Sequence, residues 1–153
     1  MPIHENDVGT APDITDLLIA ITTIESRILR VVRDGAREIA LEELTSELAL
    51  LARDLGRCYR RVADLRDRRD LSFTTQRKLH RLQEQCIWLY RKSHKERSFF
   101  KKLSLETQLR SLISHDAFGV YQQLLNAEDE ERRLAAHDDA SLAACLLAEP
   151  ETP

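Results

Sequence analysis

The sequence predicts an all-α protein built around a long antiparallel coiled-coil hairpin, and three observations support this fold class. No proline interrupts the chain between Asp13 and Glu149, so no helix there loses a backbone donor. Apolar residues recur at alternating steps of three and four, which places one stripe along the face of a helix. Glycines number four and aromatic residues make up 5%, a composition typical of helical bundles.

The N-terminal part is expected to hold a flexible arm followed by one helix. Residues 1–12 mix glycine, proline, acidic and small residues without periodicity, which favours an arm. Asp13 follows Pro12 and is a suitable N-cap for a helix over residues 13–34. The apolar stripe of this helix consists of Ile14, Leu17, Ile21, Ile24, Ile28 and Val31.

Two longer stripes predict the hairpin, with helices over residues 37–69 and 73–104. The first stripe contains Leu41, Leu44, Leu48, Leu51, Leu55, Cys58, Val62 and Leu65. The second contains Leu79, Leu82, Cys86, Leu89, Ser93, Glu96, Phe100 and Leu103. The stripes pair position by position about residue 72, inside a segment with turn and N-cap residues, which favours antiparallel packing of the two helices.

The remaining chain is expected to pack on this hairpin. Apolar residues between Leu105 and Leu125 predict a fourth apolar face, and the pattern leaves open whether it belongs to one helix or two. The bundle domain is therefore predicted over residues 13–136. Residues 137–153 are interpreted as an acidic and apolar tail, in which Asp138 can cap a short helix.

Charge is distributed unevenly along a chain whose net charge is −3. Residues 1–50 hold 4 basic and 10 acidic side chains, residues 51–110 hold 17 and 7, and residues 111–153 hold 2 and 9. One basic cluster (Arg91, Lys92, Lys95, Arg97, Lys101 and Lys102) is expected to be neutralised by Glu38, Glu42, Glu43 and Glu47 across the hairpin. The hairpin tip, residues 53–81, keeps an excess of arginine and lysine.

Ten side chains are candidates for partner binding. Trp88 and Phe99 lie opposite the stripe of their helix, where they either anchor an interface or are covered by another helix of the bundle. The tip arginines either bind acidic partners and phosphates or form an ordinary solvated face, which the acidic tail could cover. The candidates are Arg53, Arg57, Arg60, Arg61, Arg68, Arg69, Arg77, Arg81, Trp88 and Phe99.

Motifs of enzymatic chemistry are absent from the sequence. There is no phosphate loop, dinucleotide fingerprint, nucleophile elbow or zinc-protease motif, so no catalytic residue, cofactor or metal site is predicted. Cys58 and Cys86 fall in one layer of the hairpin and form either a buried thiol layer or a redox-sensitive bridge. The first residues do not resemble a signal peptide and the longest apolar run is too short to span a bilayer, so a cytoplasmic location is expected.

These features favour a non-enzymatic helical adaptor, chaperone or scaffold. Its partner would be another protein or a second copy of the chain, contacted through helices. The alternative is a nucleic-acid-associated regulator that uses the arginine-rich tip. The acidic flanks of the chain count against that alternative, because nucleic-acid-binding domains are usually basic overall.

Overall fold

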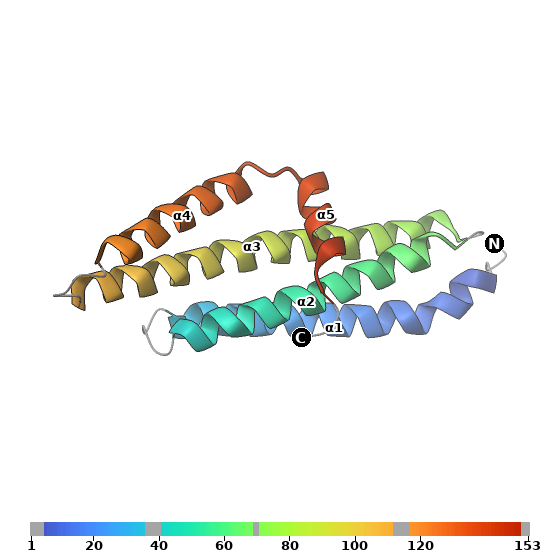
Figure 1. Cartoon of the computed structure of the whole chain (residues 1–153). Helices are drawn as coiled ribbons and strands as arrows, with labels where there is room; N and C mark the ends of the chain where they lie inside the picture. The colour runs from blue at the N-terminus through green and yellow to red at the C-terminus, as the bar shows by residue number, and fades with distance from the viewer. Residues whose placement is uncertain (1–4, 36–40, 69–70, 112–116, 151–153) are drawn as a thin grey trace.

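The computed structural model describes residues 5–35, 41–68, 71–111 and 117–150, and these residues form an all-α bundle without strands (Figure 1). The predicted fold class is therefore confirmed. The helices in chain order are α1 (Glu5–Gly35), α2 (Leu41–Arg66), α3 (Phe73–Ser111), α4 (Ala117–Ala135) and α5 (Asp139–Ala148).

Helices α2 and α3 form the predicted antiparallel hairpin at the centre of the fold. The two stripes face each other, and most of their side chains belong to one buried core that α1 and α5 complete. Leu48, Leu55 and Val62 of α2 are fully buried, as are Leu79 and Leu89 of α3. The alternating spacing of three and four therefore decided which face of each helix meets the other.

The turn of the hairpin falls where the sequence places it. Ser72 caps α3, because its Oγ accepts a hydrogen bond from the backbone N–H of Thr75 at 3.2 Å. Leu71, just before the cap, packs against the main core. These contacts satisfy a backbone donor in the first turn of α3 and fix the point where the chain reverses.

Helix α1 starts earlier than the sequence predicts. It begins at Glu5, so the prediction of a flexible arm is wrong for residues 5–12, and Asp13 is an interior residue rather than the N-cap. Pro12 stands inside the helix and removes one backbone donor, and Figure 1 shows α1 bent near this end. Beyond this defect the apolar stripe of the helix is buried against α2 and α3.

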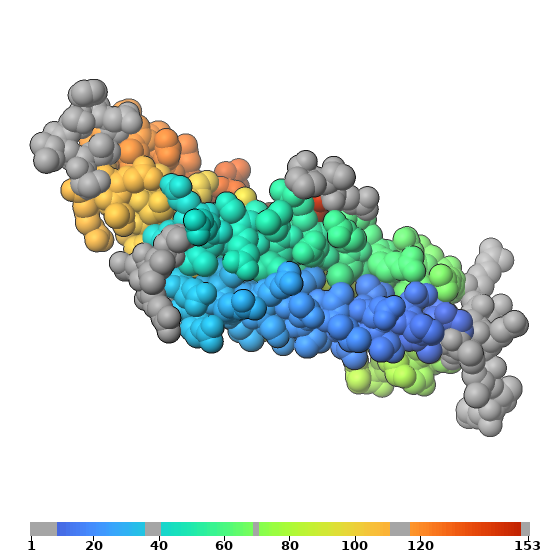
Figure 2. Space-filling model, turned by 90° about the horizontal axis from the view of Figure 1, so that it is seen from below, coloured from blue at the N-terminus to red at the C-terminus, as the bar shows by residue number. Residues whose placement is uncertain are grey.

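The arrangement of α1 matters for the surface of the protein. It packs against both helices of the hairpin, antiparallel to α2 and parallel to α3 (Figure 1). Viewed from the side of α1, the molecule shows α1 and α2 lying next to each other along most of their length (Figure 2). One long edge of the hairpin is therefore covered, and the outward face of α1 forms part of the molecular surface.

Helix α3 is longer than predicted and forms a second, smaller core with α4. It continues to Ser111, and α4 begins at Ala117, so two helices rather than one carry the fourth apolar face. Helix α4 returns along the side of α3 that lies away from α1 and α2 (Figure 1). The buried members of the second core are Leu105, Val120, Leu124 and Ala127.

The acidic partners of α3 also differ from the prediction. Lys101 pairs with Glu130 at 3.8 Å, and Lys102 pairs with Glu131. These cations are therefore neutralised by α4 and not by the glutamates of α2. Sequence reasoning missed this pairing because it assigned these lysines to the glutamates that lie level with them across the hairpin.

The C-terminal segment is part of the bundle rather than a separate tail. Asp138 caps α5 as predicted, since its carboxylate accepts from the backbone N–H of Ser141 at 2.8 Å. Leu142 and Leu146 of α5 are buried in the main core, and the helix crosses α2 and α3 steeply (Figure 1). Burial of two leucines contributes a few kcal/mol, which is enough to dock a short helix.

The two hairpin cysteines form a buried thiol layer. Cys58 and Cys86 are both free and buried. Burial raises the pKa of each thiol. The Asp54 carboxylate raises the pKa of Cys58 further, and Cys58 raises that of Cys86 further. A thiol with a raised pKa forms little thiolate, so both side chains act as core groups.

Gly56 provides a test of the docked position of α5. A Cβ at this position would lie 2.7 Å from the carbonyl oxygen of Leu146, so Gly56→Ala must displace α5. We expect Gly56→Ala to lower the free energy of unfolding by about 1 kcal/mol or more, although alanine is the better helix former. Hydrogen exchange of the α5 amides should accelerate in this variant.

Gly9→Ala is the matched control, because a Cβ at Gly9 would meet no atom within 4 Å. This variant should keep the wild-type stability or gain up to about 1 kcal/mol from helix propensity. Equal effects of the two substitutions would contradict the close contact between α2 and α5.

Candidate functional site

Helix α3 carries a second regular stripe beside its buried one. Its members follow one another at alternating steps of three and four, so they lie along one side of the helix. We call this set the cation–aromatic stripe: Lys78, Arg81, Gln85, Trp88, Lys92, Lys95 and Phe99. It includes three of the predicted candidates, Arg81, Trp88 and Phe99.

The two aromatic side chains of the stripe are exposed. Trp88 is 55% exposed and Phe99 is 53% exposed, so the interpretation that other helices cover them is wrong. The ammonium group of Lys92 lies over the Trp88 ring, with Nζ 5.6 Å from the ring centroid. This contact holds a cation beside the largest apolar side chain of the stripe.

The cations of the stripe lack acidic partners within the described parts of the chain. Lys78, Arg81 and Lys95 are exposed, and neither they nor Lys92 form an ion pair with a described residue. Lys92 and Lys95 belong to the cluster that the sequence predicted to be neutralised by α2. Because α2 packs on the other side of α3, its glutamates form no ion pair with these lysines.

Two arginines of the predicted tip, Arg60 and Arg61, bind other parts of the same chain. Arg60 Nη1 donates to the carbonyl oxygens of Leu146, Leu147 and Glu149 at 3.3, 3.3 and 3.1 Å. Carbonyls at the end of a helix have no intrahelical donors, so the guanidinium of Arg60 caps α5. Arg61 pairs with Asp13 of α1 at 3.3 Å.

The other predicted arginines do not form one cluster with them. Arg57 is exposed and pairs with Asp54 at 3.8 Å on the same helix. Arg53 is half-buried, and Arg68 and Arg77 are exposed. Arg69 lies outside the described residues. The predicted tip arginines therefore have different roles. Arg60 caps α5, Arg57 and Arg61 form ion pairs, and Arg81 belongs to the cation–aromatic stripe.

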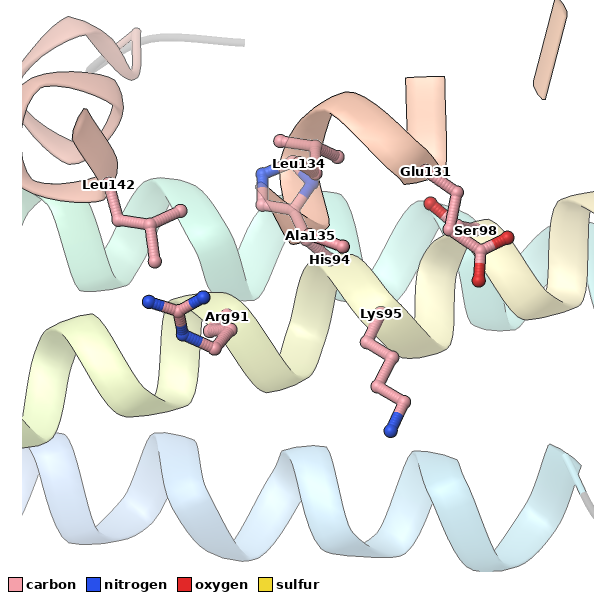
Figure 3. Close-up of a pocket in the computed structure, with 8 residues that line it drawn as sticks. All are labelled: Arg91, His94, Lys95, Ser98, Glu131, Leu134, Ala135 and Leu142. Carbon is pink, nitrogen blue, oxygen red and sulfur yellow. The ribbon is translucent and has the colours of Figure 1, made fainter. Parts of the chain in front are cut away.

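A pocket of about 300 Å³ lies where α3, α4 and α5 meet (Figure 3). Its wall includes His94 of α3, Leu134 of α4 and Leu142 of α5. In Figure 3 the Lys95 side chain leaves α3 in the direction of α1 and away from Leu134. Lys95 is itself one of the residues that line this pocket, and its side chain extends from the edge of the pocket toward α1 in this view.

His94 is a titratable group at this junction whose pKa is lowered. Its ring lies edge-on to Tyr90, with centroids 4.4 Å apart, and its buried Nε2 has no hydrogen-bond partner among the described residues. Burial lowers the pKa of His94, and the nearby Arg97 lowers it further. The Tyr90 hydroxyl donates to the Glu149 carboxylate at 2.7 Å. Because Glu149 is the C-cap of α5, this bond connects α3 to the C-terminal end of α5.

Sequence reasoning missed part of this surface. Lys78, Lys92 and Lys95 were not among the candidates, although their alternating spacing with Trp88 was visible. Lys92 and Lys95 were instead assigned to the cluster that was expected to pair with glutamates across the hairpin. Only the position of α1 distinguishes the exposed stripe from an ordinary solvated face.

Replacing Arg60 tests the capping of α5. We expect Arg60→Ala to lower the free energy of unfolding by about 1.5–3 kcal/mol, the usual range for hydrogen bonds that involve a charged group. Chemical denaturation provides the measurement. Arg57→Ala is the control, because its exposed ion pair should contribute about 0–1 kcal/mol. Similar losses in the two variants would contradict the special role of Arg60.

The lowered pKa of His94 predicts a pH dependence of stability. Below about pH 6.5 the unfolded chain binds a proton at this residue while the folded chain resists it. The free energy of unfolding should therefore fall as pH decreases from about 6.5 toward the folded pKa, by at most about 1.4 kcal/mol per pH unit for this group. Urea denaturation of the wild type and His94→Gln between pH 7.5 and 5 measures the slope.

The slope of His94→Gln should be shallower than that of the wild type. His80→Gln, in which an exposed imidazole is replaced, controls for the loss of a histidine as such. An equal change of slope in both variants would show that burial of His94 is not the cause.

No described helix is long and apolar enough to cross a membrane. No group of three or more histidine, cysteine, aspartate or glutamate residues in the described ranges has a geometry suited to a metal ion. Comparison of the chain with protein-family models, curated proteins and solved structures gave no match.

Proposed function

We propose that this chain is a non-enzymatic adaptor, chaperone or scaffold that acts through helix–helix contact with another protein. The observation that carries the proposal is the exposure of Trp88 and Phe99 on the central helix of the bundle. Large aromatic side chains on a surface are characteristic of interaction sites, and tryptophan is enriched among the residues that contribute most to binding.

The apolar surface of α1 supports the same proposal. Leu18, Ile19 and Leu29 are each about half exposed or more, although α1 buries a complete apolar stripe against the hairpin. These aliphatic side chains lie on the helix next to the cation–aromatic stripe. A partner that covered both helices would bury apolar area from each.

The nucleic-acid alternative has less support. Arg60 caps α5 and Arg61 pairs with α1, so two of the predicted phosphate-binding groups already have intramolecular partners. The remaining exposed arginines of the predicted set lie on α2, in the segment after it and on α3: Arg57, Arg68, Arg77 and Arg81. We therefore place a protein partner first and keep nucleic acid as an outcome of the experiments.

The proposal is tested by the partner and the assembly state of the intact protein. Affinity purification from native extract and light scattering of the purified chain should reveal a stoichiometric protein partner or a defined oligomer. The double variant Trp88→Ala/Phe99→Ala should lose at least about tenfold in affinity, since each truncation of a central interface aromatic costs roughly 1–2 kcal/mol or more. Because both side chains are exposed, its thermal stability should remain close to that of the wild type.

The control is Phe73→Ala/Phe118→Ala, which removes two exposed aromatic side chains that lie outside the stripe. This variant should bind as the wild type does. A monomer without any stoichiometric partner would contradict the proposed function. Undiminished binding by the Trp88→Ala/Phe99→Ala variant would contradict the observation on which it rests.

A further inference from the structure

The cation–aromatic stripe forms one side of a seam between α3 and α1. Gln85 Nε2 of α3 donates to the Glu25 carboxylate of α1 at 3.4 Å, which sets the register of the two parallel helices. One turn further along each helix stand Trp88 and Leu29, so these two exposed side chains lie at the same level. The seam therefore pairs an aromatic side chain from α3 with an aliphatic one from α1.

The α1 side of the seam continues with neutral and apolar residues. Counting from Glu25 at steps of three and four, the positions are Leu18, Thr22, Leu29 and Val32. Leu18 is 49% exposed and Leu29 is 50% exposed, whereas Val32 is partly buried against the core. The α1 side is thus suited to contact with the apolar face of another helix.

The α3 side of the seam is positive. Lys78, Arg81, Lys92 and Lys95 stand there, and none forms an ion pair with a residue in the described ranges. Glu25 is the acidic residue at the α1 positions of the seam, and it already accepts from Gln85. Acidic side chains of a partner would therefore be complementary to this side.

We propose that the α1–α3 seam binds one amphipathic, acidic helix of another protein. The inference rests on the proposed function and names the chemical class of the partner. The bound helix would place leucine-like residues at steps of three and four over Leu18, Leu29 and Trp88, and would direct its glutamates and aspartates toward the four cations. From Lys78 to Phe99 the stripe spans about 30 Å, so a partner helix of about 20 residues covers it.

Other occupants fit this surface less well. Two copies of the chain joined symmetrically through this seam would bring the same cations together, which is unfavourable. A membrane would require continuous apolar surface, but Thr22, Glu25 and Gln85 interrupt it. Nucleic acid would require cations on both sides of the seam, whereas the α1 side presents Leu18 and Leu29.

Synthetic peptides test the inference directly, because Trp88 is the only tryptophan of the chain and its fluorescence reports on the seam. The probes are two 21-residue helical peptides without tryptophan that carry leucines at steps of three and four. One carries glutamates beside the leucines and the other carries lysines at the same positions. The glutamate peptide should shift the Trp88 emission to the blue and bind at least about tenfold tighter than the lysine peptide, with an affinity that falls as salt rises.

Charge reversal provides the decisive comparison. Lys78→Glu/Lys92→Glu/Lys95→Glu should reverse the preference, so that this variant binds the lysine peptide more tightly than the glutamate peptide. Arg53→Glu/Arg57→Glu/Arg68→Glu removes as many cations from α2 and the segment just after it, and should keep the wild-type preference. Circular dichroism and thermal unfolding of both variants establish that the bundle is retained.

Several outcomes would overturn the inference. These are equal affinity for the two peptides, an unchanged preference after charge reversal in the seam, or a Trp88 shift only with anionic vesicles or duplex DNA. If a native partner binds the wild type and the charge-reversed variant equally but binds Trp88→Ala/Phe99→Ala more weakly, the inference fails and the proposed function stands. If no protein or peptide binds at all, both fail.

Discussion

The fold depends on the buried apolar interface between α2 and α3. Its fully buried side chains include Leu55 and Val62 of α2 and Leu79 and Leu89 of α3. Helices α1 and α5 pack on the two helices that this interface holds together. An isolated hairpin of this length would leave half of each helix exposed. The heptad spacing therefore provides the scaffold, and the three other helices determine which parts of its surface remain accessible.

Helix α3 is the shared element of the whole molecule. It contacts all four other helices. The cation–aromatic stripe, with Trp88 at its centre, lies on a part of its surface that these helices leave at least partly exposed.

The position of α5 determines which of the arginines on α2 are available to bind a partner. As a run of residues, Arg57, Arg60 and Arg61 resemble a surface for phosphates or acidic proteins. In the folded chain Arg60 satisfies the last carbonyls of α5, and close packing at Gly56 seats that helix against α2. Charge that looks available for binding is thus partly required for the stability of the bundle.

The sequence by itself determined the all-α class, the hairpin, its turn at Ser72 and the cap of α5 at Asp138, because these depend on local spacing and local hydrogen bonds. It also identified Trp88 and Phe99, but not their exposure. Only the tertiary structure decided the helical start at Glu5, the pairing of Lys101 with α4, the use of Arg60 inside the molecule and the seam between α1 and α3. Each of these depends on which helix covers which face, and a periodic pattern describes the faces of one helix without specifying its neighbours.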